Sequence, residues 1–263
     1  MLEIARYEAE RRLRGTIALA VGIGVLSLVF LGFFPSFGDA DLEGLVEAYP
    51  PAFQEAFGIQ AIGTIEGFLA IEVYQFVWLL LLGLYVAYAA ASSIAGDVER
   101  DRMDLVLSLP VSRGRVVGET FAALALPVLV LNVIVPIAVY GGVLAIGESI
   151  SVADLAMVHL LSIPYLLTCT AIGLLLSVMI TRASVASRLA IAAVFVLFLL
   201  ESITVSTDGY EWIGSVSPTH YYDPTAILVD GTYDLQGAVI LLAATAALVL
   251  IARALFARGD IGS

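Results

Sequence analysis

Six apolar stretches, each about as long as a membrane-spanning helix, limit the possible folds of this chain more than any other feature. They cover approximately residues 16–34, 73–94, 116–146, 155–180, 188–206 and 235–256. About 20 apolar residues are enough to cross a bilayer, and lipid offers the backbone no hydrogen bonds, so each stretch should be helical. Hydrophobic residues make up 60% of the chain, compared with about 45–50% in a typical soluble domain. We predict an all-α polytopic membrane protein, with six transmembrane helices in a single domain over residues 1–263.

The arginines predict the orientation of these spans. The sequence contains no lysine, and its twelve arginines form four groups: Arg6, Arg11, Arg12 and Arg14; Arg100, Arg102, Arg113 and Arg115; Arg182 and Arg188; Arg253 and Arg258. Six spans place all four groups on one side, which the positive-inside rule makes cytoplasmic. Both termini are therefore expected in the cytoplasm, with outer loops at residues 35–72 and 207–234. Together with Glu148, Asp154 and Glu201, which are expected on the same side, these segments hold no arginine but 15 of the 24 acidic residues.

The net charge of −12 allows two interpretations. The acidic outer segments could collect cations, or the whole composition could reflect the acidic bias of halophilic proteins. The absence of lysine favours the second interpretation.

Residues 1–15 form a charged, amphipathic segment before the first span. Arg6, Arg11, Arg12 and Arg14 lie in it, beside apolar residues such as Leu2 and Leu13. One interpretation is a cytoplasmic elbow helix that lies along the membrane interface. The alternative is that the segment is simply the polar start of the first span.

The stretch from Ser93 to Arg115 carries four acids and four arginines and lies between two apolar runs. Its apolar residues recur at a spacing close to one face of a short helix, at Val98, Met103, Leu105, Val106 and Leu109. Pro110 should end that helix. A charged helix between two membrane spans offers a surface to a partner, so we predict a docking element here.

Several kinds of chemistry are absent from the sequence. Without lysine there is no GxxxxGK[ST] phosphate loop, and neither HExxH nor GxSxG occurs. Cys169 is the single cysteine and lies within a span, which excludes a disulfide framework and favours a core position. We predict no catalytic residue, no metal site and no bound cofactor in this chain, and hence no enzyme activity of its own.

Four polar residues within or near the spans need partners. His159 could relay protons, but a hydrogen bond to a neighbour is the favoured interpretation. Asn132 can bond across helices, while Glu119 and Glu201 lie near span ends where we expect them to reach water. No span carries a charged stripe, so a lipid-like or amphipathic cargo is favoured over one that needs a wide hydrophilic pore.

The sequence IAGDVERDRMDLVLSLPVSRGRVV resembles the loop between the second and third spans of type-2 ABC transporter permeases. That family typically has isoleucine-alanine-glycine, acids, arginine, an aspartate-leucine-leucine run and a leucine-proline-x-serine-arginine close. The matching positions here are Ile94, Ala95, Gly96, Asp97, Glu99, Arg100, Asp104, Leu105, Leu107, Leu109, Pro110, Ser112 and Arg113. The chain departs from the pattern at Asp101 and Arg102, where members usually have Gly-Thr, and at Glu119, where they often have lysine.

The resemblance implies a permease subunit of the plasma membrane that exports its substrate and pairs with a second copy or a related subunit. Separate ABC-type ATPase subunits would bind ATP and Mg²⁺ and dock on the charged stretch. The docking residues it implies are Asp97, Glu99, Arg100, Arg102, Met103, Asp104, Leu105, Leu109 and Arg113. Lipid is a further partner, and no nucleic acid is expected. The alternative is a nucleotide-independent protein, either a secondary carrier or a membrane anchor for another complex.

Overall fold

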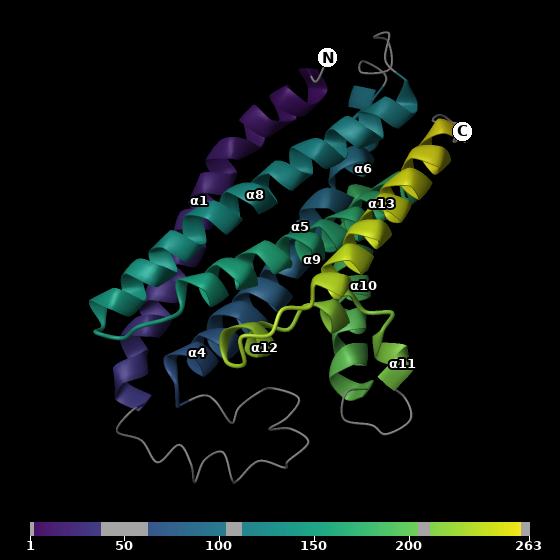
Figure 1. Cartoon of the computed structure of the whole chain (residues 1–263). Coiled ribbons are helices and arrows are strands. Elements are labelled where there is room, and N and C mark those ends of the chain that lie inside the picture. Colours follow the sequence, from purple (N-terminus) through teal and green to yellow (C-terminus); the bar gives the residue numbers. More distant parts are fainter. Residues whose placement is uncertain (1–2, 38–62, 104–111, 205–210, 259–263) are drawn as a thin grey trace.

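The computed structural model describes residues 3–37, 63–103, 112–204 and 211–258, which form helices and turns without a strand among them (Figure 1). Six helical stretches in this part of the chain are long and apolar enough to cross a membrane: Arg12–Ser36, Ile65–Glu99, Arg113–Ala145, Val152–Met179, Ala183–Thr204 and Leu235–Arg258. The all-α fold with six candidate spans is therefore confirmed.

The first span belongs to one long helix, α1 (Glu3–Phe37). Residues 3–15 continue this helix without a break, so the structure corrects the expectation of a separate elbow helix and supports the alternative of a polar start to the first span. No proline or glycine interrupts residues 3–14, and helix propagation is therefore unhindered. The contact of the four arginines with lipid headgroups stays a prediction.

The second span begins earlier than the apolar run indicated. It is built from α4 (Ile65–Phe68), the π-helix η2 (Leu69–Leu82), α5 (Gly83–Ala91) and α6 (Ser93–Glu99). Thr64 caps its first turn, because the Thr64 hydroxyl accepts a hydrogen bond from the Gly67 amide. The outer loop predicted at 35–72 is therefore too long at both ends. Glu66 and Glu72 concealed the apolar face of this start, where Ile65, Phe68 and Leu69 are buried.

The remaining spans are α8 (Arg113–Ala145), α9 (Val152–Met179), α10 (Ala183–Thr204) and α13 (Leu235–Arg258). Between the last two lie α11 (Glu211–Gly214), the 3₁₀-helix η3 (Pro218–Tyr221) and α12 (Pro224–Leu228). The segment predicted as the 207–234 outer loop thus contains three short helices. Asp223 caps α12 by accepting hydrogen bonds from the amides of Thr225 and Ala226.

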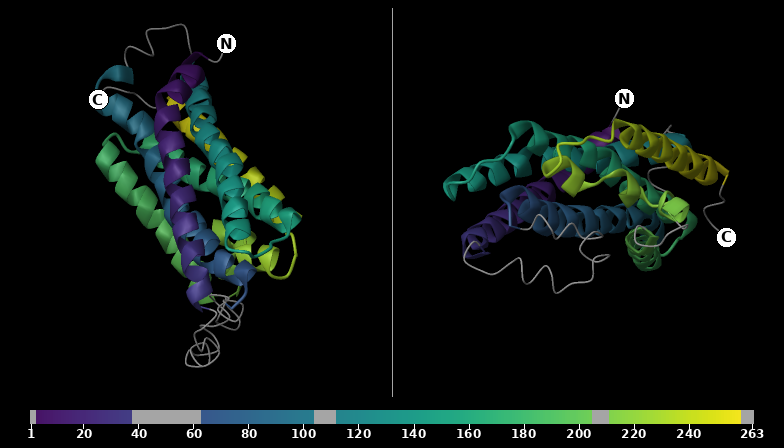
Figure 2. Two further views of the ribbon diagram at one scale, coloured as in Figure 1. Left: turned by 90° about the vertical axis from the view of Figure 1, so that its left-hand side faces the viewer. Right: turned by 60° about the horizontal axis from the view of Figure 1, so that its bottom comes forward.

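Helix α9 occupies the centre of the bundle, where it packs against α5, α8, α10 and α13, while α1 packs mainly on α8 (Figure 2). Helices α5 and α9 approach closely because Gly173 has no side chain: a β-carbon there would lie 2.2 Å from the carbonyl oxygen of Ala87. A small residue on each helix therefore permits this close packing within the subunit.

The start of α1, the end of α13 and the described parts of the charged stretch lie at one end of the bundle. Figure 1 shows the start of α1, the end of α13, α6 and the start of α8 there, while α11 and α12 lie at the other end. This grouping is the one that the arginine pattern requires. That this end faces the cytoplasm stays a prediction.

Candidate docking site and the helices behind it

The described part of the docking stretch consists of α6, residues 100–103 and residues 112–115, which lead into α8. Glu99, Arg100 and Arg102 are exposed, while Asp97 and Arg113 are half-buried. Asp104, Leu105 and Leu109 lie outside the described residues. The structure therefore brings together at one end of the bundle those predicted docking residues that it describes.

The helix expected across Val98–Leu109 is interrupted. α6 ends at Glu99, and Asp101 adopts a left-handed conformation with φ of 55°. Aspartate tolerates this region better than most residues that carry a side chain, and glycine tolerates it best. Asp101 occupies the position at which the resemblance to type-2 permeases implies glycine, and its left-handed backbone is one that glycine would adopt readily.

Met103 was predicted to be a docking residue, but its side chain is buried inside this chain and is not exposed to a partner. It is 2% exposed and belongs to a buried cluster with residues of the second span, α8, α9 and α13: Ala90, Ile94, Val116, Val117, Leu124, Leu174, Ala252 and Phe256. Burial of an apolar side chain of this size stabilises a structure by about 1.5–3 kcal/mol. Met103 thus anchors the stretch to the bundle.

Two hydrogen bonds join α6 to the neighbouring spans. The backbone amide of Ala95 donates to the hydroxyl of Ser177 in α9 at 2.9 Å, in a buried position. The carboxylate of Glu99 accepts from the backbone amide of Ala183, the first residue of α10, at 3.1 Å. A negative charge at a helix N-terminus also interacts favourably with the helix dipole. Glu99 therefore has a partner within the chain, which sequence reasoning did not foresee.

The two acids expected to reach water are more enclosed than predicted. Glu119 is 5% exposed, and Arg115, one helical turn earlier, holds it at 2.6 Å. Glu201 is half-buried and lies 3.0 Å from Nδ1 of His220 in η3. Neighbouring elements cover both carboxylates, which the position of a residue within a span does not reveal.

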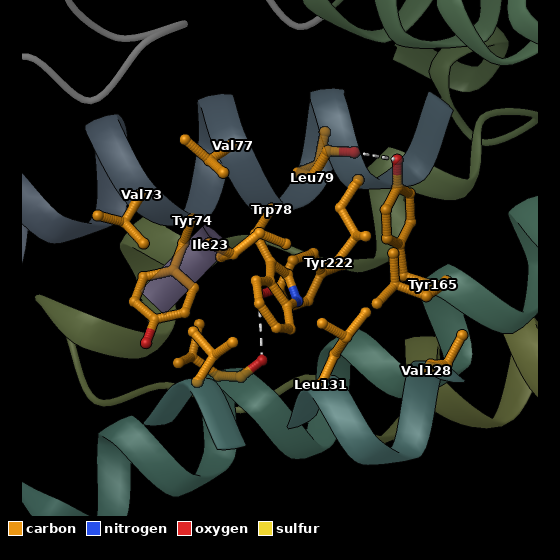
Figure 3. Close-up of a cluster of buried hydrophobic side chains, with 14 of the residues drawn as sticks. Ile23, Val73, Tyr74, Val77, Trp78, Leu79, Val128, Leu131, Tyr165 and Tyr222 are labelled. Carbon is orange, nitrogen blue, oxygen red and sulfur yellow. Dashed lines mark hydrogen bonds between the residues drawn. The ribbon is translucent and has the colours of Figure 1, made fainter. Parts of the chain in front are cut away.

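A buried polar cluster connects three spans. His159 of α9 lies 2.9 Å from the hydroxyl of Tyr74 and 3.1 Å from Oδ1 of Asn132, and the Trp78 indole donates to Ser162. Figure 3 shows Tyr74 and Trp78 entering the core from the π-helical segment, beside Leu131 of α8. The hydrogen-bonded interpretation of His159 and the cross-helix role of Asn132 are confirmed.

Sequence reasoning missed the other members of this cluster. Tyr74 and Trp78 are spaced i, i+4 and His159 and Ser162 i, i+3, so each pair of polar groups lies on one helix face. Cys169 is buried, as predicted. Within the described ranges, no group of three or more histidine, cysteine or acidic residues is placed to hold a metal ion.

The comparisons give the family. The family model described as ABC-2 family transporter protein matches residues 2–261. Comparison with curated proteins found no match. Members of this family are membrane subunits that do not themselves carry the catalytic activity of the transporter. Because the match covers nearly the whole sequence and the fold has six candidate spans, the chain belongs to the ABC-2 transporter family and is a multi-pass membrane protein.

Proposed function

We propose that this chain is the permease subunit of an ATP-driven exporter of the plasma membrane. A separate ATPase docks on the stretch Ser93–Arg115, and two copies, or one copy and a related subunit, form the path for the substrate. The family match over residues 2–261 is the observation that carries this proposal. Because a chain without lysine cannot build a phosphate loop, the partner binds and hydrolyses ATP with Mg²⁺.

The contacts of α6 support a mechanical role for the docking stretch. A movement that an ATPase imposes on α6 reaches α9 through the Ala95–Ser177 bond and α10 through the Glu99–Ala183 bond. Packed helices transmit displacement because protein interiors have low compressibility. Glu99 therefore acts as a positioning residue that links the docking element to the fifth span.

The exposed arginines are the best candidates for direct contact with the ATPase. Arg100 and Arg102 lie beyond the end of α6 and are exposed, whereas Met103 beside them is buried. Charged side chains at the rim of an interface set register and partner choice. Asp104, Leu105 and Leu109 complete the proposed surface and stay expectations from the sequence.

The alternative of a secondary carrier receives less support. Carriers hold their coupling ions near the middle of the membrane. Among the described spans, the acids all lie toward span ends: Glu66, Glu72, Asp97, Glu99, Glu119, Asp154 and Glu201. Arg115 holds Glu119, and His220 holds Glu201. A carrier would therefore have to rely on the neutral cluster around His159. The membrane-anchor alternative predicts that the protein bound to this chain is not an ABC-type ATPase.

The test is co-purification of an ABC-type ATPase, taken from the neighbouring coding sequence, with this chain from detergent. Arg100→Glu together with Arg102→Glu reverses the exposed charges without altering Glu99 or Met103. The matched control is Arg188→Glu with Arg258→Glu, which makes the same change at two exposed arginines outside the docking stretch.

We expect the wild-type chain and the control to retain the ATPase, and the Arg100/Arg102 variant to lose most of it. If the wild-type chain brings down no ATPase, the permease proposal fails. If the ATPase binds all three proteins equally, the permease proposal stands but its docking surface lies elsewhere.

A further inference from the structure

A groove of about 520 Å³ lies between the second half of α8 and the first half of α9. These helices run side by side (Figure 1). The walls of the groove are apolar, and Val133, Ile137 and Leu160 on its rim are each more than half exposed. Its volume lies within the range of about 300–1,000 Å³ that is usual for small-molecule sites.

The floor of this groove is polar. Asn132, in the middle third of α8, and His159 of α9 both line it and are 9% and 3% exposed. Polar side chains at this depth in a membrane protein are costly unless they bond to one another or to a ligand. An apolar groove with a few convergent polar groups is the usual composition of a ligand site.

The hydrogen bonds fix which way each floor group points. Nδ2 of Asn132 donates to the carbonyl of Val128 at 2.9 Å, so Oδ1 of Asn132 is the acceptor for Nδ1 of His159 and for the hydroxyl of Ser162. The His159 ring therefore carries its proton on Nδ1, and its Nε2 accepts from the hydroxyl of Tyr74. Nδ1, Nε2 and Oδ1 are all occupied.

One donor remains. An asparagine amide carries two N–H bonds, and the described residues accept only one of those on Asn132, through Val128. Asn132 lines the groove, so a molecule in the groove can supply the missing acceptor. The described lining residues include no acid and no arginine, so a charged ligand would find no counter-ion there.

We infer that the groove between α8 and α9 binds a neutral, membrane-soluble molecule that combines an elongated apolar body with a carbonyl-type oxygen, and that this oxygen accepts the free N–H of Asn132. An ordinary lipid chain has no acceptor at this depth. A helix of a second copy has its backbone carbonyls engaged within the helix. An apolar molecule with a carbonyl group can pack against the apolar walls and accept the hydrogen bond from Asn132.

The site goes beyond the proposed function, because binding here requires no ATPase. It is also connected to the second span. A ligand that bonds to Asn132 joins the cluster in which His159 holds Tyr74 of the π-helical segment. Occupancy of the groove can therefore bias the position of the span that ends in α6.

A long-chain 4-alkylbenzophenone tests the inference, since it is neutral, apolar and carries a ketone. Under near-ultraviolet light its excited carbonyl abstracts hydrogen from a nearby C–H bond, and the two resulting radicals join as a new carbon–carbon bond. The full chain in lipid vesicles is irradiated with increasing probe, and the labelled peptides are mapped by mass spectrometry. The competitor is the matching 4-alkyldiphenylmethane, which has a similar shape without the carbonyl.

We expect saturable labelling of α8 and α9 residues that line the groove, and the diphenylmethane should compete about fivefold more weakly than an unlabelled benzophenone. Leu160→Trp fills the groove from its rim and should abolish this labelling. Leu189→Trp, on the exposed face of α10, should leave it unchanged. Asn132→Leu removes the donor and should weaken labelling about fivefold, the effect of one hydrogen bond.

Three results would overturn the inference. Labelling that does not saturate, or that spreads over α1, α10 and α13, would show general partitioning into lipid. Equal competition by the diphenylmethane would show that the carbonyl has no partner. Absence of labelling in the groove of the wild-type chain would show that something else, such as a second copy, covers it. None of these results depends on whether an ATPase co-purifies.

Discussion

The carboxylate of Glu99 bonds to the backbone amide of Ala183, so the end of α6 also forms the N-terminal contact of α10. The Ala95–Ser177 bond attaches the same helix to α9. A short helix is thus connected by hydrogen bonds to two spans that follow it by about 80 residues in the sequence. Under the proposed function, this arrangement separates the arginines that bind the ATPase from the contacts that transmit its movement.

Replacement of Glu99 by alanine should loosen the first turn of α10 without removing the ATPase. Loss of a capping contact costs about 0.5–2 kcal/mol, and an exposed contact lies at the lower end. We expect backbone amides in the first turn of α10 to exchange hydrogen about two- to fivefold faster. Mass spectrometry of the exchanged peptides measures this, with Glu148→Ala, at an exposed acid in the turn before α9, as control. If Glu99→Ala abolishes ATPase binding as the Arg100/Arg102 variant does, Glu99 is a docking residue.

Asp101 should tolerate glycine but not a β-branched residue. Its φ of 55° costs an ordinary side chain about 1–2 kcal/mol, while glycine adopts it freely. We expect Asp101→Gly to leave the thermal unfolding midpoint in detergent unchanged or slightly raised, and Asp101→Val to lower it. A midpoint that falls equally in both variants would mean that the aspartate side chain, and not the backbone, matters here.

Gly173→Ala should force α5 and α9 apart. The added methyl group would meet the backbone of Ala87, which cannot move aside as a flexible side chain can. Overpacking of this kind typically costs about 1–3 kcal/mol. Gly22→Ala is the control, because a β-carbon at Gly22 meets nothing within 4 Å. Equal unfolding midpoints for the two variants would contradict the close packing of these helices.

The Tyr233 hydroxyl donates to the Asp154 carboxylate, and this bond raises the pKa of Tyr233 above its ordinary value of about 10. A raised pKa in the folded state means that the contribution of the contact is complete below about pH 10 and is lost as the pH rises through the higher folded value. Ultraviolet absorbance follows the ionisation of tyrosines to phenolate as the pH rises. After Tyr233→Phe, one tyrosine fewer should ionise above the pH at which ordinary tyrosines do. Asp154→Asn should return that tyrosine to the main group, and an unchanged titration would exclude the bond.

The features that follow from local sequence were predictable. Six apolar runs predicted six spans, and the position of Cys169 within a span predicted its burial. The bonding of His159 and Asn132 followed from the cost of polar groups in lipid. The start of the second span was missed because Glu66 and Glu72 interrupt its apolar face, although Thr64 offers a helix cap.

The features that depend on tertiary contacts were not predictable. Nothing in the periodicity of residues 93–115 shows that Met103 turns inward or that Glu99 contacts α10. The break at Asp101 had a signal, since related permeases usually have glycine there. The reason for glycine at this position, a left-handed backbone, became visible only in the structure.

The π-helical segment Leu69–Leu82 holds more residues in each turn than an α-helix, because its hydrogen bonds close over one additional residue. Deleting one residue from α9 would rotate everything beyond it by about 100°. If Leu80 or Leu81 is deleted instead, one π-helical turn can tighten to an α-helical turn. The two ends of the span, at Thr64 and α6, then keep their orientation about the helix axis. The second span is therefore where an evolving sequence can lose a residue while its two ends stay aligned.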